Sequence, residues 1–182
     1  MTGAPIVIVT GIAEAPMAAT TIALQWDLPQ AVVMQHSIDV DEQRLHRVVS
    51  DMTGTLDHTI IELEHACVSR AIREDVVPTL HQLSEDGRWA TVIAHLPVGA
   101  EATGVCRVSA SEGRSGLPIA NVFAALEGET LVEDLLGDDL LCERAAPRAG
   151  RSLFDVRGEA ALVQGGEVGR GQVGHLDAHP AR

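Results

Sequence analysis

The sequence predicts an α/β fold, with a mainly parallel sheet and helices on both of its faces. Short apolar, β-branched runs alternate with amphipathic stretches along the first 144 residues, which is the pattern of βαβ units. An apolar fraction of 46% in a chain of 182 residues is enough for one domain with a real core. Only 2% of the residues are aromatic, so Val, Leu, Ile and Ala must build that core.

The individual elements follow from local patterns. Five apolar runs are typical of buried strands, at 5–10, 31–36, 59–63, 89–96 and 119–126. Helices are expected at 15–26, 45–52, 76–83 and 129–137. The helix at 45–52 depends on apolar residues spaced i, i+3, i+4 and i+7, and on Asp39 and Glu42, whose spacing resembles a capping box. Pro78 should disturb the third helix, and Gly87 should end it.

The composition changes near Ala145. Residues 1–144 hold 22 acidic and 8 basic side chains, whereas residues 145–182 hold 4 and 5. The second segment also contains 7 of the 17 glycines, including the stretch "VQGGEVGRGQVG". We therefore predict an ordered domain over 1–144 and a glycine-rich, weakly ordered tail over 145–182.

Charge and cysteine usage exclude several classes of protein. The net charge is −13 and every basic side chain is Arg, which disfavours nucleic-acid binding. The three cysteines have unrelated spacings and suggest no disulfide framework. The N-terminal apolar run is too short for a signal peptide or a membrane span. A soluble, cytoplasmic protein without a membrane partner is the expectation.

Ligands of open α/β sheets bind at the carboxyl ends of the strands. Three loops should reach that edge: "TGIAEAP" after the first strand, "EHACVSR" after the third and "LPVGAEATG" after the fourth. This order predicts that Cys67 lies on the functional edge near Gly11. His95 ends the fourth predicted strand and is expected at the same edge.

The first of these loops has some features of a phosphate cradle. Gly11 follows a buried strand, and Thr20 and Thr21 lie on the next helix. A P-loop needs a second Gly and a Lys beside the Ser/Thr, and this chain has no Lys at all. Three alternatives stay open: a nucleotide cradle, a weak anion site at the helix N-terminus, and an ordinary tight turn.

Cys67 also has three possible roles. With His65, and with Glu64 or Glu62, it could bind a metal, because zinc prefers thiolate and imidazole ligands. It could be a nucleophile activated by Arg70, although no base with an orienting partner is visible. It could also be a partly buried, unreactive residue. No catalytic residue is predicted.

The stretch "IELEHACVSRAIREDVVPTL" resembles the CobW family of P-loop GTP-dependent metallochaperones, and its actinobacterial-type branch most of all. In that family a strand leads into a Gly-Cys-x-Cys-Cys metal motif and then into "LREDL" at the start of a helix. The first loop and "VIAHLPVGAEATGV" fall where the family has its P-loop and its Glu-x-x-Gly segment. The similarity extends over residues 5–144. It implies a P-loop NTPase-like fold, a zinc or other metal ligand, GTP with magnesium, and a client protein.

The chain departs from the family at the residues that carry its chemistry. Of the three motif cysteines only Cys67 remains, and Ser69 and Arg70 occupy the other two positions. The P-loop Lys and the Gly before it are absent, and Glu127 is the carboxylate nearest to the expected strand-five Asp. Phosphoryl transfer depends on such a Lys and on Mg²⁺, so GTP hydrolysis is not expected.

The sequence-based hypothesis is a truncated, degenerate CobW-like protein of zinc or metal homeostasis. Cys67 and His65 would be its metal contacts, and Gly11, Thr20 and Thr21 its residual nucleotide loop. A non-enzymatic protein-interaction module is one alternative. Another is a nonfunctional fragment, because the shift in composition near Ala145 is also what a changed reading frame would produce.

Overall fold

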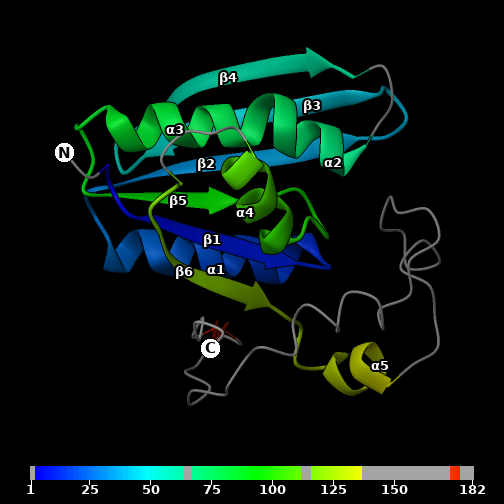
Figure 1. Ribbon diagram of the computed structural model, residues 1–182. Helices are drawn as coiled ribbons and strands as arrows, with labels where there is room; N and C mark the ends of the chain where they lie inside the picture. The colour runs from blue at the N-terminus through cyan, green and yellow to red at the C-terminus, as the bar shows by residue number, and fades with distance from the viewer. Residues whose placement is uncertain (1–2, 64–66, 112–115, 137–172, 177–182) are drawn as a thin grey trace.

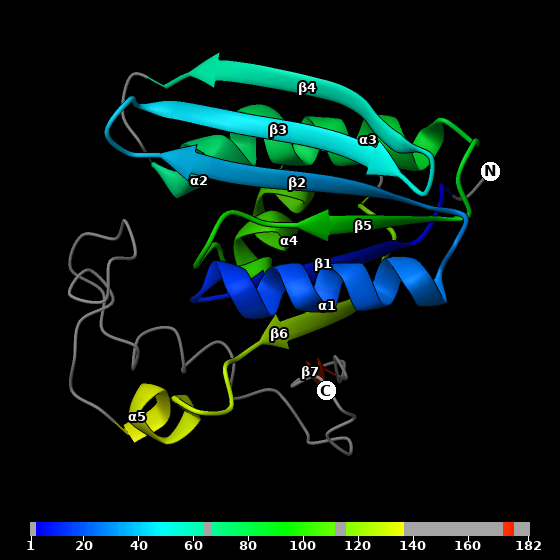
Figure 2. The ribbon, with the colours of Figure 1, turned by 180° about the vertical axis from the view of Figure 1, so that it is seen from behind.

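The computed structural model describes residues 3–63, 67–111, 116–136 and 173–176. These residues form one mixed sheet with helices on both faces (Figures 1 and 2). The strands are β1 (Ile6–Gly11), β2 (Ala31–Asp39), β3 (Arg44–Asp51), β4 (Gly54–Glu62), β5 (Thr91–His95), β6 (Ile119–Ala125) and β7 (Val173–Leu176). The helices are α1 (Glu14–Asp27), α2 (Val68–Ala71), the π-helix η1 (Ile72–Val76), α3 (Val77–Glu85), α4 (Ala102–Ser111) and α5 (Leu131–Leu136).

The sheet has a parallel centre and antiparallel margins. Its strand order is β4-β3-β2-β5-β1-β6-β7, in which β2, β5, β1 and β6 are mutually parallel. The hairpin strands β3 and β4 extend it antiparallel on one side, and β7 does so on the other. The predicted α/β class with helices on both faces is confirmed. The prediction of a mainly parallel sheet is wrong, because half of the strand pairings are antiparallel.

Helix α1 covers one face of the parallel centre, and α2, η1, α3 and α4 cover the other (Figure 2). The larger core lies under the second group, where Ile8, Met34 and Leu80 are fully buried. The smaller core lies under α1 around Met17 and Ile93. Strand β1 contributes to both, and that two-sided burial explains its continuous apolar sequence.

The predicted helix at 45–52 is wrong, since these residues form β3 and the turn that follows it. Leu45 and Val49 point to the helical layer and are buried, as the helical pattern also required. Between them, on the same face, lies Arg47, whose guanidinium bonds to Asp75. A charged residue at a core-facing position broke the period-2 alternation that normally indicates a strand.

The predicted capping box is a turn between β2 and β3. The Oδ1 atom of Asp39 accepts a hydrogen bond from the backbone N–H of Glu42 at 2.9 Å, which is the i to i+3 bond of a capped helix. No helix follows it: Gln43 has a positive φ of 52°, and β3 begins at Arg44. The same local bond therefore reverses the chain here.

Helix α2, η1 and α3 run on without a break from Val68 to Glu85. The predicted irregularity at Pro78 is confirmed, in the form of a π turn in which the N–H of Val77 bonds to the carbonyl of Ile72. Gly87, with a positive φ of 77°, follows the end of α3 as predicted.

Most of the predicted tail, including the proposed boundary at residue 144, lies outside the described residues. Within it, Val173–Leu176 is described as β7, which pairs with Val122–Ala125 of β6. None of the described helices is long and apolar enough to cross a membrane.

Candidate functional site

The carboxyl ends of β1, β2, β4 and β5 lie at the same edge of the sheet. Strand β3 runs antiparallel to β2, and β4 runs antiparallel to β3, so β4 again points in the direction of the parallel strands (Figure 1). The loop after β4 therefore reaches the edge that the first loop also reaches. The predicted placement of Cys67 at this edge is confirmed.

Cys67 lies immediately before α2 and is exposed. Its carbonyl accepts the backbone N–H groups of Arg70 and Ala71, both at 3.1 Å, which fixes the backbone at the start of the helix. The guanidinium Nε of Arg70 bonds to Glu74 at 2.8 Å, one turn further on. The interpretation of Cys67 as a partly buried residue is wrong, since the side chain is open to solvent.

His65, the predicted partner of Cys67, lies outside the described residues, as does Glu64. Among the described residues no group of three or more His, Cys, Asp or Glu side chains is arranged to hold a metal ion. Glu62 is described and ends β4, where it faces Arg44 across the strand pair. The part of the site that the structure describes therefore consists of one accessible thiol.

Cys67 and Gly11 lie on the same edge but are not brought together. Strands β3, β2 and β5 separate β4 from β1. Four strand spacings of about 4.8 Å correspond to roughly 19 Å along the edge. The thiol and the first loop are therefore two separate places on the edge.

Gly11 is required by packing. A Cβ at this position would lie 2.6 Å from the carbonyl oxygen of Ala125 and 2.8 Å from Cγ of Met17. Its own carbonyl accepts the N–H of Gly99 at 2.6 Å, which ties the loop after β1 to the loop after β5. Both loops at the edge are thereby held by backbone contacts.

The hydroxyl groups of Thr20 and Thr21 bond within the protein. Thr20 donates to the carbonyl of Pro16 at 2.8 Å, and Thr21 donates to that of Met17 at 2.9 Å. Both side chains are buried. A threonine that bonds its own helix in this way directs no hydroxyl toward a ligand at the helix N-terminus.

Thr21 also belongs to a polar cluster that we call the His95 cluster: Glu14, Thr21, Gln35 and His95. Since the Thr21 hydroxyl donates to Met17, it accepts a hydrogen bond from Nδ1 of His95, at 2.9 Å. The Nε2 atom of His95 lies 3.4 Å from the Glu14 carboxylate, which also accepts a bond from Gln35 at 3.1 Å. Burial lowers the pKa of the fully buried His95, and the nearby Glu14 opposes that effect.

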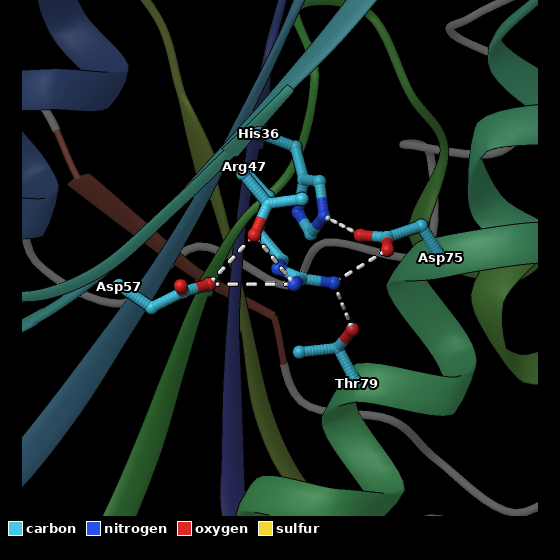
Figure 3. Close-up of polar contacts among 6 residues, drawn as sticks. His36, Arg47, Asp57, Asp75 and Thr79 are labelled. Carbon is cyan, nitrogen blue, oxygen red and sulfur yellow. Dashed lines mark hydrogen bonds and ion pairs between the residues drawn. The ribbon is translucent and has the colours of Figure 1, made fainter. Parts of the chain in front are cut away.

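A second polar cluster, the Asp75 cluster, joins the sheet to η1 and α3 (Figure 3), which cover the face of the sheet opposite α1 (Figure 2). Its centre is Asp75 of η1, which accepts hydrogen bonds from Nε2 of His36 and Nη1 of Arg47, each at 2.6 Å. Around this centre Arg47 also bonds to Thr79 of α3 and to two residues of β4, Asp57 and Thr59. His36 is fully buried and Asp75 nearly so.

The Asp75 cluster was not predicted from the sequence. Arg47 and His36, the two partners of Asp75, lie 28 and 39 residues before it in the sequence. The one available signal was the charged pair Glu74–Asp75 within an otherwise amphipathic helix. The structure shows that the two carboxylates differ in role, because Glu74 bonds to Arg70 on the surface and Asp75 connects the helix to two strands, β2 and β3.

Comparison with protein-family models, with curated proteins and with solved structures finds no match for this chain.

Cys67 provides an accessible thiol at this edge. Cys67 can coordinate a soft or borderline metal ion as a thiolate, and its exposure leaves room for ligands from another molecule. Among the described residues, no hydrogen bond joins the Cys67 thiol to a base.

Proposed function

We propose that the protein handles zinc or a related metal ion and that Cys67 is its metal contact. The observation that carries the proposal is an exposed cysteine at the carboxyl edge of an α/β sheet, at the start of the helix that Asp75 anchors. An exposed thiol can bind a metal ion and release it to a second set of ligands. A buried thiol can do neither easily.

The incomplete ligand set supports transfer in preference to storage. Structural zinc sites are closed by four protein ligands, and catalytic sites keep three. Cys67 and His65 supply two, and Glu64 or Glu62 could add a third, so water or a client protein completes the coordination. We propose that the client, a metal-dependent protein, provides the remaining ligands.

The resemblance of "EHACVSRAIREDVVPTL" to the CobW metal motif supports the same assignment. Two of the four "IRED" residues form ion pairs in this protein. Glu74 bonds to Arg70, and Asp75 bonds to His36 and Arg47. The proposal therefore includes descent from P-loop NTPases, and the parallel strands β2, β5, β1 and β6 support that part of it.

We further propose that nucleotide binding at the first loop is weak and that GTP is not hydrolysed. There is no Lys in the chain, and the Thr20 and Thr21 hydroxyls bond to backbone carbonyls. Glu14 adds a carboxylate in the first turn of α1, where a phosphate would otherwise be attracted. Any residual contact would come from backbone N–H groups near Gly11.

Isothermal titration of the full chain with Zn²⁺ under reducing conditions tests the assignment. One equivalent of zinc should bind, and Cys67→Ala should remove that binding. The matched control is Cys106→Ala, because Cys106 is also an exposed cysteine but lies on α4. Zinc binding that survives in Cys67→Ala, or that is absent from the wild type, would contradict the proposal.

A protein-interaction module is the second candidate function, and the charge of the chain favours it. A net charge of −13 with no Lys gives a surface that attracts basic partners. This candidate predicts a cooperative thermal melt, no binding of zinc or GTP, and capture of a basic protein that weakens as salt is raised.

A further inference from the structure

Strand β4 is the outer strand of the sheet on the side of the hairpin. It pairs with β3, and no described residue pairs with its other edge (Figures 1 and 2). A strand in this position presents unpaired N–H and C=O groups, which are a template for another strand. Proteins usually block such an edge with Pro, Lys, a bulge or an inward charge.

These blocking features are weak in the second half of β4. Neither Pro nor Lys occurs in the strand. The one irregularity in its pairing lies opposite Val49 and Ser50, so the six residues from Asp57 to Glu62 keep a regular register. The inward carboxylate of Asp57 is bonded by Arg47 and Thr59. A second strand can therefore approach along 57–62.

The side chains on the open face of this segment are complementary to themselves. His58, Ile60 and Glu62 point away from α3, because the alternate residues Asp57 and Thr59 bond to Arg47 on the helical side. Ile60 is 51% exposed. His58 lies two residues before Ile60 on the strand, and Glu62 lies two residues after it. Next to it on β3 lies His46, whose ring stacks on that of His58 with the centroids 6.0 Å apart.

We propose that two copies of this chain associate by antiparallel pairing of β4 with β4 of the second copy, centred on Ile60. In this register Ile60 faces Ile60 of the other copy, and His58 faces Glu62 twice, once on each side. An imidazole opposite a carboxylate is an attractive cross-strand pair, and two exposed isoleucines bury each other. On the helical face Thr59 meets Ile61.

Neighbouring registers are less favourable. Moving the centre to Ile61 places Ile60 opposite Glu62, so that an apolar side chain covers a carboxylate. Moving it to Thr59 places His58 opposite Ile60 and requires pairing through Leu56, where the ladder is irregular. The side chains of 57–62 therefore select the second copy as the occupant and Ile60 as the two-fold position. This inference does not depend on metal binding.

Sedimentation equilibrium of the full chain tests the proposal. At about 100 µM protein, where weak homodimers are populated, the apparent mass should be twice that of one chain. Ile60→Asp should return the mass to that of a monomer, with an unchanged circular dichroism spectrum. Ile22→Asp is the matched control, because Ile22 is 56% exposed on α1 and should leave the dimer intact. A monomeric wild type overturns the proposal, and so does an Ile60→Asp variant that remains dimeric.

Cysteine cross-linking tests the register separately. Ile60→Cys should form a disulfide with its own copy on mild oxidation, because directly opposed residues of antiparallel strands have Cα atoms about 4.5–5.5 Å apart. Peptide mass spectrometry identifies this linkage in the presence of the native cysteines. His58→Cys should not link to itself, since it faces Glu62. Equal self-linkage of the two variants would overturn the register centred on Ile60.

Discussion

Two buried histidines on opposite faces of the sheet are held in different ways. His36 bonds to a carboxylate, Asp75, that is itself nearly buried and is held by Arg47. His95 bonds to a neutral hydroxyl, that of Thr21, and its other nitrogen lies 3.4 Å from the half-exposed Glu14. The first arrangement is a buried ionic network, and the second is a mostly neutral contact beside solvent.

The difference indicates what each cluster does for the sheet edge. The Asp75 cluster connects β2, β3 and β4 to the helix that begins after Cys67, so it fixes the antiparallel hairpin against that helix. The His95 cluster connects β5 and β2 to α1. The Asp75 cluster depends on buried charges, and loss of one partner there is costly. The His95 cluster depends on a hydrogen bond to a single hydroxyl group.

The largest effect should follow removal of the carboxylate of Asp75. Asp75→Ala leaves Arg47 and His36 without their common partner in a buried position, which should lower the free energy of unfolding by about 3–5 kcal/mol. Chemical denaturation measures this change. Glu74→Ala is the control, since Glu74 pairs with Arg70 on the surface and should cost below about 0.5 kcal/mol. Equal effects of the two variants would mean that the Asp75 cluster is not an anchor.

A smaller effect is expected for Thr21→Val. The substitution keeps the shape of the side chain and removes the acceptor of the His95 Nδ1–H, leaving a buried donor unpaired. The cost should be about 1–3 kcal/mol. Thr20→Val provides the comparison, because the Thr20 hydroxyl bonds only to the Pro16 carbonyl and its loss should cost less. If Thr20→Val were the more destabilising variant, the role given to the His95 contact would be wrong.

The smallest effect concerns pH. Burial lowers the pKa of His95 in the folded protein below its ordinary value of 6.5. Below that pH the unfolded chain binds a proton at this residue that the folded chain does not, so stability should fall as the pH is lowered. His95→Gln should make the free energy of unfolding decline less between about pH 7 and pH 5 than in the wild type. A steeper decline in the variant would contradict the assignment.

The sequence allowed the α/β class, the helical layer and the position of Cys67 to be predicted, because these depend on local patterns. Strand β1 is buried on both faces and reads as continuous apolar sequence. Strand β3 was predicted as a helix because Arg47, at a core-facing position, pairs with Asp75, which lies 28 residues away. Such pairings depend on the topology of the sheet, and the charged pair Glu74–Asp75 in the sequence does not name its partners.

The exposed position of Cys67 was likewise beyond prediction, since exposure depends on how α2 packs on the sheet. Here Ala71 of α2 packs with Leu45 and Leu63, and that contact turns the other side of the helix to solvent. The sequence predicted that Thr20 and Thr21 could contact a nucleotide. Their burial follows from the packing of α1 on β5, which the local pattern does not report.

Absorption spectroscopy with Co²⁺ as a substitute for Zn²⁺ tests the central claim most directly, because a cobalt–thiolate bond gives a charge-transfer band that other ligands do not. The wild type and Cys106→Ala should both show this band under reducing conditions, and Cys67→Ala should not. A band that persists in Cys67→Ala, or its absence from the wild type, would contradict the assignment of Cys67 as the metal contact.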